Sequence, residues 1–220
     1  FPKYLPKEKL GIRTKLAAEL LAQRIVEAAP ELEDQAASLA KKVLEALGLK
    51  VEASKRAGDD EGKGSTKYLA FFSRGELDAL AQIAVTSVQQ GDKLDKKAIK
   101  EAFKGEKAID IALFGRMLAD VPELNTDASC QVAHAISVDA AVQEFDYFTA
   151  IDDCAADDNA GAGMIGTVDY NSSTLYRYAD INLDAFVEQL GDAQAASCGV
   201  AAFVEAFVRS MPTGKQNTFA

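Results

Sequence analysis

The segment from Asp146 to Leu183 constrains the fold of this chain more than any other part of its sequence. It begins with an aromatic cluster, passes through an acidic stretch broken by glycines, and returns as a tyrosine-rich run with the composition of a β-strand. The sequence therefore predicts a sheet that carries an exposed, pliable excursion. Flat aromatic side chains beside such an excursion suit the binding of a single-stranded nucleic acid, because unstacked bases need flat partners.

The same segment contains Gly161-x-Gly163-x-x-Gly166, which has the spacing of a dinucleotide-binding fingerprint. That fingerprint needs a buried strand before its first glycine and a helix that opens at its last, because the helix N-terminus carries the pyrophosphate. Here aspartates precede the first glycine, and a β-like and turn composition with poor helix propensity follows the last one. We therefore expect no nucleotide cofactor at this site, and the glycines instead provide unusual backbone angles in a hairpin-like excursion.

Length and composition indicate an ordinary globular protein. The chain has 220 residues, enough for a sizeable core, and an apolar content of 48%. No apolar run approaches membrane-spanning length, so we expect no membrane partner. Three widely spaced cysteines, with no second Cys or His at ligand spacing, favour a reducing cytoplasm and disfavour both a disulfide framework and a metal site. The chain begins with Phe1 and ends directly after a polar run, so we expect a truncated fragment of a longer protein.

The net charge of −10 is an objection to nucleic-acid binding, since phosphate contacts need Lys or Arg. Local patches bind ligands even on an acidic protein, however. The basic residues that crowd one short segment are Lys93, Lys96, Lys97, Lys100, Lys104 and Lys107. This segment is either a cationic patch or the solvated face of a helix, and the sequence leaves both interpretations open.

Hydrophobic spacing predicts a helical N-terminal half. Residues 12–29 and 31–47 carry apolar side chains at helical intervals, and the second run ends at Gly48, a natural stop. A strand is predicted from Tyr68 to Phe72, and the Ser73–Glu76 capping box then predicts a helix that reaches about Gln89. A further short helix is predicted from Lys96 to Phe103.

From Ile109 onward the pattern changes from helices to a mixture of strands and helices. The predicted strands are Ile109–Met117, Cys130–Ser137 and Asn171–Ile181, and the predicted helices are 184–190 and 193–211. The sequence therefore predicts an α+β fold with a helical region over residues 1–108 and a second domain over residues 109–220.

Five short motifs follow one another in a characteristic order. They are Asp110-Ile-Ala-Leu-Phe-Gly-Arg-Met117, Ala133-His-Ala-Ile136, Asp146-Tyr-Phe-Thr-Ala-Ile-Asp-Asp153, Tyr176-Arg-Tyr-Ala179 and Pro212-Thr-Gly-Lys-Gln-Asn-Thr-Phe-Ala220. Together they resemble the CasC-type backbone subunit of type I-E CRISPR Cascade complexes, a member of the Cas-seven superfamily. The resemblance runs from about Leu10 to Ala220 and is most specific from Asp110 onward.

The resemblance implies a hand-shaped protein with an RRM-like (ferredoxin-like) palm, a helical fingers insertion and an extended thumb loop over about residues 152–167. Copies of such a subunit polymerise along CRISPR RNA, assemble with other Cascade subunits and present the guide bases to target DNA. The resemblance also implies that the subunit is not itself a nuclease, and we expect no catalytic residues, no cofactor and no metal.

Candidate RNA-binding residues come from the same motifs. They are Arg116, Met117, Tyr147, Phe148, Thr149, Met164, Lys215 and Gln216. A long apolar side chain such as Met117 can wedge between bases, Arg116 can meet a phosphate or stack, and the rings offer flat faces. The alternative for the rings and methionines is packing in a core, and the alternative for Lys215 is an ordinary surface cation.

A metal-dependent enzyme is the competing function. Related backbone subunits of type III complexes cut RNA with a thumb aspartate and a divalent metal, and Asp152, Asp153, Asp157 and Asp158 offer oxygen ligands for Mg²⁺. The same acidic run is also typical of a solvated loop. No Lys or His stands near it in the sequence to act as a base, which weighs against catalysis.

Overall fold

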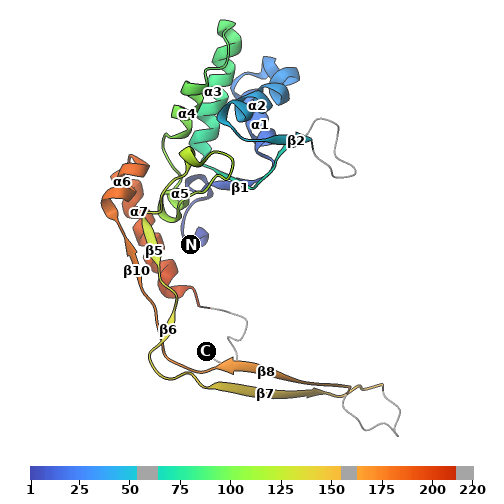
Figure 1. Ribbon diagram of the computed structural model, residues 1–220, viewed down its shortest axis with the longest axis vertical. Helices are drawn as coiled ribbons and strands as arrows, with labels where there is room; N and C mark the ends of the chain where they lie inside the picture. The colour runs from blue at the N-terminus through green and yellow to red at the C-terminus, as the bar shows by residue number, and fades with distance from the viewer. Residues whose placement is uncertain (54–63, 155–162, 212–220) are drawn as a thin grey trace. The chain divides into compact units, whose positions relative to one another are not determined.

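The computed structural model describes residues 1–53, 64–154 and 163–211 (Figure 1). The chain forms two compact units. Unit 1 contains Phe1–Gln131 together with Ile181–Ala220, and unit 2 contains Val132–Asp180. The boundary expected between residues 108 and 109 does not coincide with this division, because the chain after residue 108 stays within unit 1 for more than twenty further residues.

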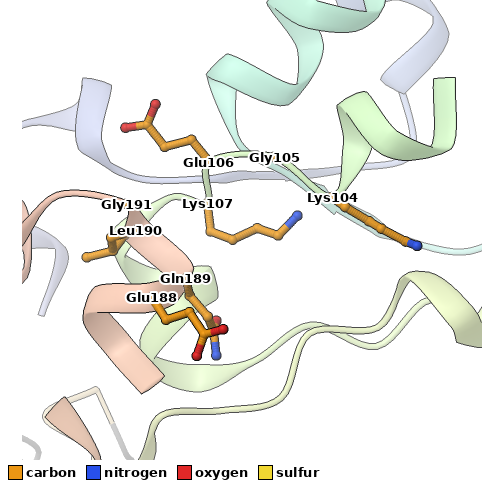
Figure 2. A pocket seen from close by; sticks show the side chains of 8 residues that line it. All are labelled: Lys104, Gly105, Glu106, Lys107, Glu188, Gln189, Leu190 and Gly191. Atoms are coloured by element: carbon orange, nitrogen blue, oxygen red, sulfur yellow. The ribbon is translucent and has the colours of Figure 1, made fainter. Parts of the chain in front are cut away.

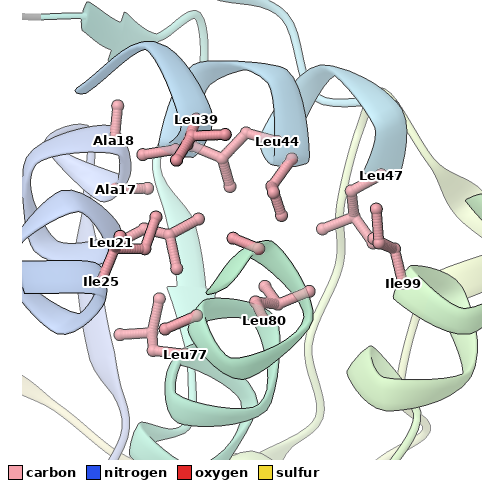
Figure 3. Packing of buried hydrophobic residues seen from close by; sticks show 14 of the residues in the cluster. Ala17, Ala18, Leu21, Ile25, Leu39, Leu44, Leu47, Leu77, Leu80 and Ile99 are labelled. Carbon is pink, nitrogen blue, oxygen red and sulfur yellow. The ribbon is translucent and has the colours of Figure 1, made fainter. Parts of the chain in front are cut away.

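Four helices enclose the main core of unit 1. They are α1 (Ala17–Ala28), α2 (Glu33–Leu47), α3 (Arg74–Gln90) and α4 (Lys96–Phe103). Each helix turns an apolar stripe inward, as Leu21 and Ile25 do on α1 and Leu77 and Leu80 do on α3 (Figure 3). The sequence predicted all four helices, α3 from its capping box, although residues 12–14 of the first predicted helix form strand β1. Burial of the apolar stripes holds the helices together.

The ends of these helices follow the predicted signals. The Ser73 hydroxyl accepts a hydrogen bond from the Glu76 amide at 3.0 Å, and the Glu76 carboxylate accepts one from the Ser73 amide at 2.8 Å. This confirms the capping box at the start of α3. Gly48, whose φ is +106°, ends α2 in the left-handed conformation that glycine adopts without steric cost.

The predicted strand from Ile109 to Met117 is wrong, because Ile109–Phe114 forms the short helix α5. Ile109, Ile111 and Leu113 are all buried, so this run shows neither the alternation of a half-buried strand nor the stripe of a surface helix. Its conformation is decided by packing against α6 (Leu183–Leu190) and α7 (Ala193–Arg209).

The strands are short except in unit 2. They are β1 (Ile12–Thr14), β2 (Val51–Ala53), β3 (Gly64–Thr66), β4 (Ala70–Phe72), β5 (Cys130–Val132), β6 (Ile136–Ser137), β7 (Gln143–Ala150), β8 (Met164–Asn171), β9 (Leu175–Tyr176) and β10 (Ala179–Ile181). They pair as β1–β4, β2–β3, β5–β10, β6–β9 and β7–β8. The mixture of helices and strands confirms the α+β class, while every sheet in the described ranges has two strands.

Four 3₁₀ turns complete the described elements, at Pro2–Tyr4, Lys7–Lys9, Pro30–Leu32 and Pro122–Leu124. None of the described helices is both long and apolar enough to cross a membrane. Cys130 is buried, whereas Cys154 and Cys198 are exposed.

Candidate nucleic-acid interface

The β7–β8 ribbon carries most of the predicted RNA-binding residues that the structure describes. Its two antiparallel strands pair from Gln143 opposite Asn171 to Ala150 opposite Met164 (Figure 1). The predicted thumb, residues 152–167, overlaps this ribbon, because Met164–Thr167 belong to β8, while residues 155–162 lie outside the described residues. The continuation of β8 through Gly166 to Asn171 agrees with the exclusion of a dinucleotide fingerprint, which would need a helix there.

Residues directly opposite each other in an antiparallel pair lie on the same face, and successive residues alternate between faces. One face, here called the open face, therefore carries the residues Gln143, Phe145, Tyr147, Thr149, Ile165, Thr167, Asp169 and Asn171. Phe145 and Tyr147 are each 64% exposed. Two exposed rings thus lie two residues apart on one face, with Asp169 opposite Phe145 and Thr167 opposite Tyr147, and Thr149 continues this face along the strand.

The opposite face carries Phe148, and that ring packs on the ribbon itself. Phe148 lies across the strand from Gly166, and a Cβ built on Gly166 would stand 2.5 Å from the Phe148 Cζ. The ring therefore occupies the space that any other residue at position 166 would fill, and Phe148 is only 39% exposed. The same packing of an aromatic ring over a cross-strand glycine stabilises designed sheets.

Two other residues of the opposite face differ in their contacts. The Tyr170 hydroxyl donates a hydrogen bond to the Glu144 carboxylate at 3.2 Å, and the charges of Glu144 and Asp146 raise the pKa of Tyr170. Met164, which pairs with Ala150 at the end of the ribbon, is exposed. The predicted residue Met164 is therefore accessible, but on the face away from Tyr147.

Unit 2 is strongly acidic. Residues 132–180 contain nine Asp or Glu residues and one basic residue, Arg177. Contacts from this unit to a nucleic acid would therefore rely on rings, hydroxyls and amides, because carboxylates repel phosphate. Among the described residues no group of three or more His, Cys, Asp or Glu side chains could hold a metal ion. Asp157 and Asp158 lie outside that range, so the predicted metal-binding aspartates are described only in part.

Arg116 and Met117 are adjacent in sequence but differ completely in their surroundings. Met117 is 79% exposed and free to contact a ligand. The Arg116 guanidinium is buried: its Nη1 lies 2.7 Å from the Glu76 Oε2, and its Nη2 donates to the Leu124 carbonyl. It also stacks over the Phe103 ring, 4.2 Å from the centroid. As described, Arg116 holds unit 1 together and is closed to a phosphate.

Lys107 shares the same buried carboxylate. Its ammonium donates to the Glu76 Oε1 at 2.7 Å and to the Phe103 carbonyl at 2.6 Å. Burial lowers the pKa of Lys107, and the attraction of Glu76 only partly opposes this effect. The lysine-rich segment is therefore divided: Lys107 is structural, whereas Lys93, Lys96 and Lys97 are exposed around the start of α4.

A hollow of about 570 Å³ lies beside Lys107, between the ends of α4 and α6 (Figure 2). Lys104, Glu106, Glu188 and Gln189 are among the residues that line it. Figure 2 shows the Lys107 side chain extending away from the Glu106 carboxylate. Because its lining mixes both signs of charge, the hollow favours neither anions nor cations.

The remaining predicted residues, Lys215 and Gln216, lie outside the described residues. Phe145 was missed by sequence reasoning, although the alternation Phe145-x-Tyr147-x-Thr149 signals a strand with one aromatic face. A set of cations on β1 and the loops near it was also missed, because those residues are far apart in the sequence.

Two solved structures are similar to this chain. A chain of a solved "CRISPR RNA-guided surveillance complex, pre-nicking" is 34% identical over 95% of the present chain, with a TM-score of 0.66. A chain of a second "CRISPR RNA-guided surveillance complex" is 28% identical over 92%, with a TM-score of 0.54. The present chain spans 59% and 55% of those two chains. A comparison with curated protein sequences gave no match. Residues 2–220 match the family described as CT1975-like protein, and the chain therefore belongs to that family.

Proposed function

We propose that this protein is a structural, RNA-binding backbone subunit of a CRISPR surveillance complex of the Cascade type. Copies of it would polymerise along CRISPR RNA in the cytoplasm and, with other subunits, present the guide bases to target DNA. The five sequence motifs favour type I-E. The family match and the likeness to chains of two surveillance complexes support this proposal.

The observation that carries the proposal is the open face of the β7–β8 ribbon. An isolated two-stranded ribbon is marginally stable in water, and exposed aromatic pairs are typical of binding surfaces. Phe145 and Tyr147 present stackable rings, and Met117 is an exposed wedge. Stacking tolerates any base, since every base has a flat face, and this suits a subunit that must hold guides of many sequences.

The RRM-like palm is part of the same proposal. An RRM sheet has four strands, whereas each described sheet has two. The proposed palm therefore needs more strands than any one of the described sheets contains. Met164, Thr149, Lys215 and Gln216 remain proposed RNA contacts. Phe148 is proposed to act indirectly, by holding the ribbon in shape against Gly166, and Arg116 is not proposed as a contact.

The test is binding of a fluorescently labelled single-stranded RNA to the full chain and to Tyr147→Ala. Loss of one stacking ring is expected to weaken binding by about 1–3 kcal/mol, which is roughly 5- to 150-fold. Tyr170→Ala is the matched control, because it removes a tyrosine from the other face of the same ribbon. Equal affinities for Tyr147→Ala and the parent would refute the proposed role of the open face.

The same binding reaction tests the enzymatic alternative. Incubating the bound RNA with Mg²⁺ is expected to leave it intact, as a structural subunit requires. Cleavage that disappears in Asp153→Ala would instead establish a metal-dependent nuclease.

A further inference from the structure

A cationic surface lies on unit 1, on β1 and on the segments that pair with it, and none of its residues was among the predicted RNA contacts. The strands β1 and β4 pair with Ile12 opposite Phe72, Arg13 opposite Phe71 and Thr14 opposite Ala70. Phe72 and Ala70 are buried in the core of unit 1. Because faces alternate along a strand, the Arg13–Phe71 pair lies on the outer side, and Arg13 is exposed.

Each of the two aromatic rings of this surface, Phe71 and Tyr68, lies beside a cation. The Arg13 guanidinium lies 4.7 Å from the centroid of the Phe71 ring. A Cβ built on Gly11 would stand 2.5 Å from the Phe71 Cε2, so this ring lies directly against the backbone at Gly11. The neighbouring Tyr68 is 47% exposed, and the Lys67 ammonium lies 5.2 Å from its centroid. Both arrangements fit cation–π contacts at an exposed site.

Backbone hydrogen bonds bring two more lysines to the same place. The Lys67 amide donates to the Lys50 carbonyl at 3.1 Å, which continues the pairing of β2 with β3. The Thr66 amide donates to the Lys15 carbonyl at 2.8 Å. Lys15, Lys50 and Lys67 are all exposed. Three segments that are distant in sequence thus converge, each contributing a cation.

These cations are largely uncommitted. Arg13, Lys15 and Lys50 form no ion pair with another described residue. The pKa of Lys67 is raised, mainly by Tyr68 and less by the carboxylates of Asp120 and Glu52. Unit 2 differs in charge, because it contains nine acidic residues and one basic residue, Arg177. Exposed lysines and an arginine beside aromatic rings match an anionic ligand that also has flat groups.

We propose that Arg13, Lys15, Lys50 and Lys67, together with Tyr68 and Phe71, form a binding surface for a single-stranded polynucleotide. The cations meet phosphates, and the exposed Tyr68 ring stacks on a base. An acidic peptide would satisfy the charges but would leave the rings without flat partners. These residues belong to unit 1, whereas the β7–β8 ribbon belongs to unit 2, and the proposal does not depend on the proposed function of the ribbon.

The experiment measures binding of labelled 20-nucleotide oligo-U and oligo-dT to the full chain over a series of salt concentrations. The triple variant Lys15→Gln, Lys50→Gln, Lys67→Gln is compared with the parent. For single strands the slope of log affinity against log salt falls by about 0.7 for each phosphate contact removed, so three contacts change it by about 2. The same change corresponds to roughly 100-fold weaker binding at 0.1 M salt than in the parent.

Tyr68→Ala is expected to weaken binding without changing the salt slope, because stacking releases no counterions. Lys41→Gln, on the exposed side of α2, is the matched control and is expected to leave both affinity and slope unchanged. Comparison of oligo-U with oligo-dT identifies whether RNA or DNA is preferred. Thermal unfolding of each variant verifies that the fold is kept.

Three outcomes would overturn the proposal. They are an unchanged slope in the triple variant, an unchanged affinity in Tyr68→Ala, and equally tight binding of polyglutamate, which has charge but no bases. Loss of oligonucleotide binding in Tyr147→Ala but not in the triple variant would refute this surface and leave the ribbon proposal standing. The reverse pattern would refute the ribbon proposal alone.

Discussion

Replacing Arg116 by alanine is expected to destabilise the protein strongly in the absence of any nucleic acid. The guanidinium Nη1 donates to the Glu76 Oε1 at 2.9 Å, to the Glu76 Oε2 at 2.7 Å and to the Phe71 carbonyl at 3.1 Å. These contacts connect α3, β4 and the segment after α5. The ring of Phe103 on α4 covers the same guanidinium. Removing it therefore loosens several elements of unit 1 at once.

The magnitude follows from burial. The side chains of Arg116 and Glu76 are 1% and 0% exposed, so water cannot replace the lost partner without opening the core. Removing one member of a buried ion pair costs about 3–5 kcal/mol. Lys107 still pairs with Glu76 in the variant, which places the expected loss near the lower value, about 3 kcal/mol. For a chain of 220 residues this lowers Tm by about 6–12 °C.

The assay is thermal and urea unfolding of the RNA-free protein, followed by circular dichroism. Arg24→Ala is the matched control, because Arg24 pairs with Glu27 and Asp78 at the surface. Exposed pairs contribute about 0–1 kcal/mol, so its Tm should barely change. If Arg116→Ala unfolds at the same temperature as Arg24→Ala, the structural assignment of Arg116 is incorrect and a direct role in RNA binding returns.

Three further predictions concern single side chains. Ser73→Ala removes the cap of α3 and should lower the free energy of unfolding by about 0.5–2 kcal/mol. Ser87→Ala, inside the same helix, should lower it less, and equal losses would contradict the role of the cap. Gly166→Ala should displace the Phe148 ring and speed amide hydrogen exchange in β7. Gly163→Ala is the control, because its Cβ would make ordinary contacts, and identical exchange rates in the two variants would contradict the packing of the Phe148 ring. Because burial lowers the pKa of Lys107 below its usual 10.5, the folded protein loses this proton at lower pH than the unfolded chain does. The free energy of unfolding should therefore rise with pH just below 10.5 in the parent relative to Lys107→Met, and parallel pH profiles would contradict this.

Local signals in the sequence were sufficient for the described helices of unit 1 except α5. The apolar stripe of α1 and the capping box at Ser73 are short-range features, so the residues that determine them are close together in the chain. The strands β7 and β8 of the ribbon were not among the predicted strands, although the aromatic alternation around Tyr147 is also a short-range signal. The sequence could not predict which residues of β7 and β8 lie opposite each other, because the register depends on both strands.

Long-range contacts decided the features that the sequence did not predict. Arg116 lies beside Met117 in a motif that suggested RNA contacts, yet its partner Glu76 is forty residues away. α5 is helical because its apolar residues are covered by α6 and α7, which come seventy or more residues later. The cationic surface around Arg13 is assembled from three separated segments, so no local pattern marks it.

We expect the open face of the β7–β8 ribbon to hold RNA by stacking. The most direct measurement is an electron cryomicroscopy structure of the complex assembled on CRISPR RNA from the intact subunits. The rings of Phe145 or Tyr147 are expected to lie against bases of the guide. An open face covered by protein, or left in solvent while the guide passes elsewhere, would contradict it.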